Sequence, residues 1–137
     1  MSLADDIAAA IVTALTPVVS ANSGSGPYHQ VVPQTSAAFP RVIFDIENDR
    51  DENDTPTRAK DILFSVKVIS ATGFKQANNV LDACDVILHD GTFSLTGWHV
   101  YWLMRESSTP RRADPKEGGG YFYQTGATYR LKVEKEL

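Results

Sequence analysis

The sequence predicts an α+β fold: an antiparallel or mixed β-sheet, two main helices packed on one face of it, and long hairpin loops. Two segments have apolar residues at spacings of three and four, as helices do, and four others alternate in the manner of strands. The strand segments follow one another in pairs rather than alternating singly with helices, which favours antiparallel pairing. The 137 residues are expected to form a single domain.

The first helix is predicted over residues 3–15, with Ser2 as its N-cap and Pro17 ending it. Residues 22–27 then read as a flexible connection. The apolar run of residues 7–21 is not expected to be a secretory signal, because Asp5 and Asp6 precede it and a signal carries positive charge there. Its 15 residues are also few for a membrane span. One face of the helix combines Leu3, Ile7, Ile11, Ala14 and Leu15.

The second helix is predicted over residues 74–89, and Gly91 stands where a glycine commonly follows a helix. Its apolar stripe consists of Phe74, Ala77, Leu81, Cys84 and Leu88, widened by Val80 and Ile87.

Four main strands are predicted, over residues 39–47, 61–70, 97–107 and 121–136, and residues 28–33 are expected to add a short edge strand. The clearest is the second, in which Ile62, Phe64, Val66 and Val68 share one face. The inward residues of the others are predicted to be Val42, Phe44 and Ile46; Trp98, Val100, Trp102 and Met104; and Tyr129, Leu131 and Val133. Base stacking by the tryptophans is the alternative to this core packing.

Two polar segments connect the strands. The acidic run of residues 49–54 is expected to lie in a long hairpin connection, and residues 106–120 in a mobile loop that a neighbouring molecule orders. The acidic run does not fit a calcium loop, because Asp54 stands in place of the required glycine and Lys60 in place of the bidentate glutamate.

Composition and motifs argue against several functions. The net charge of −4 disfavours general binding to nucleic acid or to an anionic membrane. The single cysteine, Cys84, excludes an internal disulfide framework and suits a reducing cytoplasm. Neither a metal-ligand spacing nor a catalytic pattern involves His29, His89 or His99. We therefore expect no enzyme activity, no cofactor and no metal.

Three passages of the sequence, taken with the order of the predicted elements, resemble a known protein family. The passages "VPQTSAAFPRVIFDI", "SATGFKQANNVLDACDVIL" and "YRLKVE", after the first helix, resemble the tail terminator or tail completion proteins of long-tailed bacteriophages and prophages over nearly the whole chain. That resemblance implies a structural protein of the virion tail, present in the host cytoplasm during assembly. It implies a ring, commonly of six copies, that caps the tail tube, ends its polymerisation and forms the head–tail joining surface.

The implied partners are further copies of the chain, the tail tube protein and the head–tail connector protein, with DNA passing through the ring without specific binding and no membrane involved. The alternatives are a head–tail connector or neck protein and, from another class, a small enzyme or ligand-binding domain. The charged segments could line the ring lumen, form an interface, or only aid solubility. The lumen or interface candidates are Asp49, Asp51, Glu52, Asp54, Arg58, Arg111 and Arg112.

Overall fold

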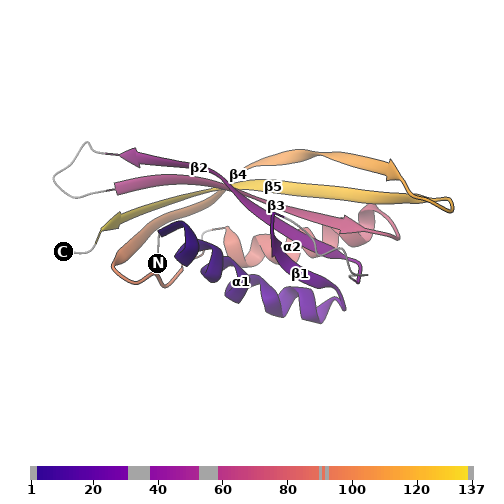
Figure 1. Ribbon diagram of the computed structural model, residues 1–137, viewed down its shortest axis with the longest axis horizontal. Helices are drawn as coiled ribbons and strands as arrows, with labels where there is room; N and C mark the ends of the chain where they lie inside the picture. Colours follow the sequence, from indigo (N-terminus) through magenta and orange to yellow (C-terminus); the bar gives the residue numbers. More distant parts are fainter. Residues whose placement is uncertain (1–2, 31–37, 53–58, 90, 92, 136–137) are drawn as a thin grey trace.

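The computed structural model describes residues 3–30, 38–52, 59–89, 91 and 93–135, and for residues 48–52 it describes the backbone alone. The elements are α1 (Leu3–Ala21), β1 (Ser25–His29), β2 (Arg41–Glu52), β3 (Ala59–Ser70), α2 (Phe74–Leu88), β4 (Trp98–Pro115) and β5 (Tyr121–Lys135). The strands form one sheet in the order β1-β2-β3-β5-β4. Because β1 pairs in parallel with β2 and the other pairings are antiparallel, the sheet is mixed. Both helices lie on one side of it (Figure 1), which confirms the predicted α+β class.

The core lies between the helices and the central strand, β3. Its four predicted inward residues, Ile62, Phe64, Val66 and Val68, are fully buried. The neighbouring strands add their own buried residues in register: Phe64 pairs with Tyr129 of β5, and their rings stack at a centroid distance of 5.5 Å. The inward residues predicted for β5 are likewise buried, and so are Val42 and Phe44 of β2.

Helix α1 runs through Pro17 and ends at Ala21, so the prediction that this proline ends the helix is wrong. Pro17 lies on the exposed side, whereas Val18 and Val19, which follow it, are buried. Burying two valines offsets much of the backbone cost of an internal proline, about 3 kcal/mol. The helix then closes through hydrogen bonds from the Asn22 side chain to the Val18 carbonyl and from the Gly24 amide to the Val19 carbonyl.

By length and composition α1 could cross a membrane. Its five buried residues instead pack in the core, next to β1, β2 and α2. The polar stretch after it also differs from expectation, since Ser25, Gly26 and Pro27 belong to β1 rather than to a flexible connection. The predicted edge strand therefore exists but begins earlier, and Pro33 lies outside the described residues.

Helix α2 matches its prediction closely and ends one residue earlier, at Leu88. It packs on β3 and β5, and its buried residues are Ala77, Val80, Leu81, Cys84 and Leu88. The Gly91 amide donates to the Leu88 carbonyl just beyond the helix end.

The predicted mobile loop over residues 106–120 is wrong for most of its length. Strand β4 continues to Pro115 and pairs with β5 as far as Tyr121. A tight turn joins them, in which the Lys116 amide donates to the Gly120 carbonyl. Gly118, Gly119 and Gly120 have φ values of 86, 99 and 82°, which glycine adopts far more readily than other residues. Figure 1 shows the hairpins β2–β3 and β4–β5 extending beyond the helices in opposite directions.

Leu81 offers a direct test of the packing of α2 on the sheet. Its side chain is 3% exposed, so Leu81→Ala should lower the free energy of unfolding by about 2–5 kcal/mol in urea denaturation. Val86, which is 82% exposed on the same helix, provides the control: Val86→Ala should change it by less than about 0.5 kcal/mol. Equal small effects of the two variants would contradict the packing of α2.

Candidate functional site

The sheet face opposite the helices carries polar and apolar side chains together. Because side chains alternate along a strand, the residues of β3 that alternate with its four buried ones face this side. Asp61, Leu63 and Lys67 are among them, and they pair with Lys132, Arg130 and Gly126 of β5. Neither helix covers this face in Figure 1.

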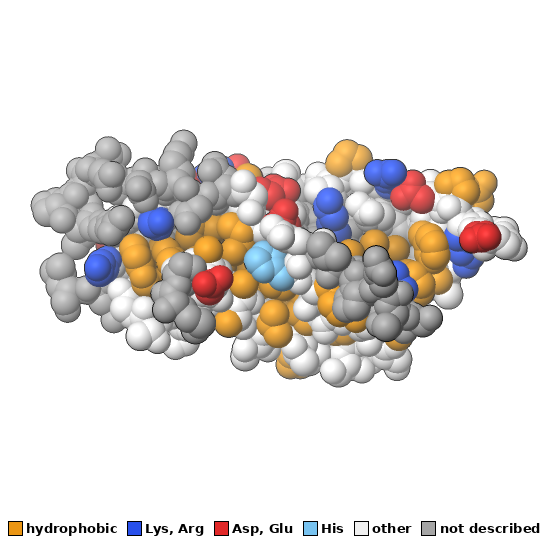
Figure 2. All heavy atoms as spheres, in the orientation of Figure 1, with side chains coloured by type: hydrophobic (Ala, Val, Ile, Leu, Met, Phe, Trp, Pro, Cys, Tyr) orange, Lys and Arg blue, Asp and Glu red, His pale blue; other side chains and the backbone are white. Residues whose placement is uncertain are grey.

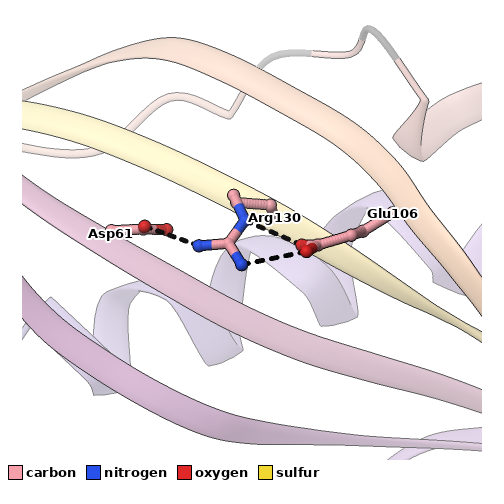
Figure 3. A network of polar contacts seen from close by, with 3 residues as sticks. All are labelled: Asp61, Glu106 and Arg130. Carbon is pink, nitrogen blue, oxygen red and sulfur yellow. Dashed lines mark hydrogen bonds and ion pairs between the residues drawn. The ribbon is translucent and has the colours of Figure 1, made fainter.

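Arg130 organises the middle of this open face (Figure 3). Its guanidinium donates from Nη1 to Asp61 Oδ2 on β3 at 2.5 Å. On the other side it donates from Nε and Nη2 to the two oxygens of Glu106 on β4, at 2.7 and 3.0 Å. Such a two-point contact fixes the carboxylate in orientation as well as in distance. Arg130 therefore ties the edge strand β4 and the central strand β3 together across β5.

The two carboxylates of this network differ in their exposure to solvent. Asp61 is 3% exposed, whereas the Glu106 side chain is 42% exposed. The hydrogen bonds from Arg130 lower the pKa of Glu106 below its ordinary value, and Glu106 in turn raises the pKa of Arg130. Because water screens Glu106, its own contribution to stability is expected to stay below about 1 kcal/mol.

The lowered pKa of Glu106 determines how the stability of the protein should change with pH. A carboxyl group whose pKa falls on folding stabilises the protein above its unfolded value, near 4.5, and loses this effect as the pH falls through the folded value. Glu106→Gln should thus be slightly less stable than the wild type at pH 7 and equally stable well below pH 4. Urea unfolding at both pH values measures this, with the exposed Glu117→Gln as a control that leaves the difference near zero. An unchanged gap at low pH would show that the charge of Glu106 is irrelevant.

A β-bulge decides which side chains of β4 face the core. The register shifts between Val100, which pairs with Val133, and Trp102, which pairs with Lys132. One extra residue moves the side chains that follow it to the other face, up to the next register shift after Arg105. Leu103 is therefore buried, and Trp102 is 46% exposed on the open face. The prediction that Trp102 packs inward is wrong, and the same shift carries Met104 away from the core side.

The helix side of the sheet has a second polar cluster at the end of α2. Tyr129 donates from its hydroxyl to Asp85 Oδ1 at 2.8 Å, and Arg105 Nη1 lies 3.6 Å from the same oxygen. The Arg105 amide donates to His89 Nδ1 at 3.0 Å. Burial, together with the Asp85 charge, raises the pKa of Tyr129. These contacts fix the last turn of α2 to β4 and β5.

We call the end of the β4–β5 hairpin, residues 109–121, the arm. It combines basic and aromatic side chains, and in Figure 2 orange, blue and red spheres occur together at the end of the molecule where Figure 1 places this hairpin. The Arg111 guanidinium lies 5.7 Å from the ring centroid of Phe74, and Lys116 Nζ lies 5.5 Å from that of Phe122. Arg112 Nε is 2.8 Å from Asp114 Oδ1. Arginine and aromatic residues are enriched in interfaces between proteins.

The sequence candidates fall into two separate groups. Asp49, Asp51 and Glu52 lie on β2, where they pair with Ile62, Lys60 and Ala59 of β3, so their predicted place in a connection is wrong. Asp54 and Arg58 lie outside the described residues. Arg111 and Arg112 are exposed on β4 rather than in a loop.

The histidines have different surroundings. His29 stacks on Phe44 at 4.9 Å, His89 accepts the bond from Arg105, and His99 is exposed. Over the described ranges, no group of three histidine, cysteine or acidic residues could hold a metal ion. Hollows of about 370 and 400 Å³ lie between α1 and residues 93–96 and between α2 and β4.

Comparison with known proteins identifies the family. Residues 9–118 match the family described as "Tail completion protein gp17". The chain belongs to this family. It is thus a structural, tail-related protein of a phage virion, as the sequence predicts.

A solved structure supports the fold of this tail completion protein independently. A chain in the structure titled "Virion of native gene transfer agent (GTA) particle" aligns with a TM-score of 0.68 at 20% identity, over 93% of this chain and 96% of that chain. No curated protein matches the sequence.

The sequence of this tail completion protein did not predict the Asp61–Arg130–Glu106 network, and it indicated Arg111 and Arg112 without the hairpin that carries them. Three successive glycines between two segments without helical periodicity were the available signal for a tight hairpin turn. Nothing in the spacing of the three network residues indicated their contact, because the register of β4 depends on its bulges.

Cys84 is the cysteine of this tail completion protein, and its buried position makes it a poor nucleophile. Burial raises the pKa of its thiol to about 12, so the thiolate that reacts with electrophiles is scarce at neutral pH. The folded protein should react with a disulfide reagent such as DTNB at least about 100-fold more slowly than the protein in 6 M guanidinium chloride. Absorbance at 412 nm follows the reaction, and similar rates in the two conditions would contradict the buried position of Cys84.

Proposed function

We propose that this tail completion protein assembles as a ring, with six copies as the expected number, that caps the tail tube, ends its polymerisation and presents the head–tail joining surface. The membership of the family supports a role in tail completion. The ring and the capping step go beyond that membership and rest on the shape of the subunit.

One observation carries the proposal: the two hairpins project past the helices at opposite ends of the subunit (Figure 1). A two-stranded hairpin is barely stable in water without further packing. Strand β4 nevertheless has a single buried residue, Leu103, among its 18 residues. Extensions of this kind gain their packing from neighbouring subunits, and a subunit with different surfaces at its two ends suits repeated contacts around a ring.

The electrostatics of the chain suit a passage for DNA. With a net charge of −4 per subunit, six copies carry about −24. Such a ring repels phosphates overall, so a duplex can pass without the tight, salt-dependent binding that a basic lining produces. The proposal assigns the protein no catalytic step, since its work is to bind and to block addition of tube subunits.

Tail length provides the test. Purified tail tube protein polymerising in vitro should stop elongating when this protein is added at about one ring per growing tube end, and electron microscopy should show a cap on that end. Without it, tube lengths should spread broadly. Tubes that keep growing at a saturating concentration would overturn the proposal.

Electron microscopy also distinguishes a tail terminator from a neck protein. A head–tail connector component should bind isolated portal-containing heads and leave tube growth unchanged, whereas a terminator should bind tube ends first. Binding to heads alone would favour the neck protein.

A further inference from the structure

The hollow between α2 and β4 presents two arginine side chains and several polar groups to a ligand. Its volume is about 400 Å³, within the range of about 300–1,000 Å³ that is typical of binding pockets. Arg105 and Arg111 of β4 line it, together with Asn78 and Asp82 of α2 and the buried Thr125 of β5. Such a lining suits a polar ligand.

Arg105 is held in place beside this hollow and keeps donors to spare. Its Nη2 donates to Ser108 Oγ at 2.6 Å, and its Nη1 lies 3.6 Å from Asp85 Oδ1. Asp85 in turn accepts the hydrogen bond from Tyr129. The Arg105 side chain is 27% exposed, and most of the N–H groups of its guanidinium make no hydrogen bond to the residues that the structure describes. Arg105 is therefore positioned to donate to a further acceptor.

Arg111 has a ring beneath it but no carboxylate beside it. Its guanidinium lies 5.7 Å from the ring centroid of Phe74, and within the described ranges it forms no ion pair. Asp82 lines the same hollow without an ion pair to either arginine there. Two arginines and one aspartate give the lining a net charge of +1. The hollow therefore favours an anionic ligand.

The space is larger than a small anion needs. A second hollow of about 340 Å³ adjoins the first, because both are lined by Arg105 and Ser108. We call the two together the α2–β4 groove. A groove of this size accommodates a segment of polypeptide, of which a carboxylate is one part.

We propose that the α2–β4 groove binds an acidic peptide segment of a partner protein, with Arg105 and Arg111 each pairing with a carboxylate. The planar guanidinium matches a carboxylate because it donates two parallel hydrogen bonds to it. Arginine is also enriched among the residues that dominate binding energies in protein interfaces. This inference goes beyond the proposed ring and does not depend on it.

Fluorescence anisotropy with a labelled hexaglutamate peptide tests the groove on the full chain. At about 0.15 M salt the peptide should bind with a Kd below about 1 mM, and higher salt should weaken it. Hexaglutamine with the same label has the same length and no charge, so it should not bind measurably.

Three single variants locate the binding. Arg111→Gln should weaken hexaglutamate about 10-fold, as expected for the loss of a hydrogen-bonded charge. Arg112→Gln is the matched control: Arg112 is adjacent in sequence but pairs with Asp114 and does not line the groove, so binding should change by less than about twofold. Asp82→Asn removes the acid from the lining and should tighten binding. Thermal unfolding of each variant should stay close to that of the wild type, because all three side chains are exposed.

Several outcomes would overturn the groove. These are equal binding of the two peptides, equal losses from Arg111→Gln and Arg112→Gln, or weaker binding after Asp82→Asn. Inorganic phosphate that displaces hexaglutamate at concentrations as low as those at which the peptide itself binds would show a simple anion site instead. A wild type that self-associates in gel filtration while Arg111→Gln does not would assign the groove to contacts between copies. Peptide binding by a protein that fails to cap tubes would leave the groove standing and overturn the ring alone.

Discussion

The whole structure depends on burial of one face of β3 beneath both helices. This strand lies in the middle of the sheet, and its four alternating residues, together with their partners on β2 and β5, form the floor on which α1 and α2 pack. Burying each large apolar side chain contributes about 1.5–3 kcal/mol, so a shift of one residue in register would lose most of this energy. The register of β3 therefore constrains how β2 and β5 pair with it.

The same constraint leaves the opposite face for polar interactions. Since no helix covers it in the described structure, charged residues can occupy the centre of the sheet there, provided they are paired. Arg130 meets this condition for Asp61, and through Glu106 it extends the connection to β4. The edge strand has few buried side chains of its own, so this network and the Tyr129–Asp85–Arg105 contacts position the base of the arm.

The helices and the sheet also differ in length, and this difference creates the two projecting hairpins. Beyond the helices a strand has no apolar layer to cover, so its side chains there can be polar, as Arg111, Arg112 and Asp114 of β4 are. A polar sequence in β4 therefore does not mark a connection between strands.

The sequence by itself determined the elements that the core requires. The period-two pattern of β3 and β5 and the stripe of α2 identified their inward residues correctly, because burial selects apolar side chains at fixed intervals. The family was also recognisable from the order of these elements. Only the tertiary structure decided the rest. Helix α1 continues past Pro17 because the next two valines reach the core. Trp102 faces outward because of a β-bulge that the residue types in β4 do not predict. Strands β2 and β4 extend through polar segments because β3 and β5 supply their backbone hydrogen bonds. The pattern of side chains along a strand does not predict this pairing.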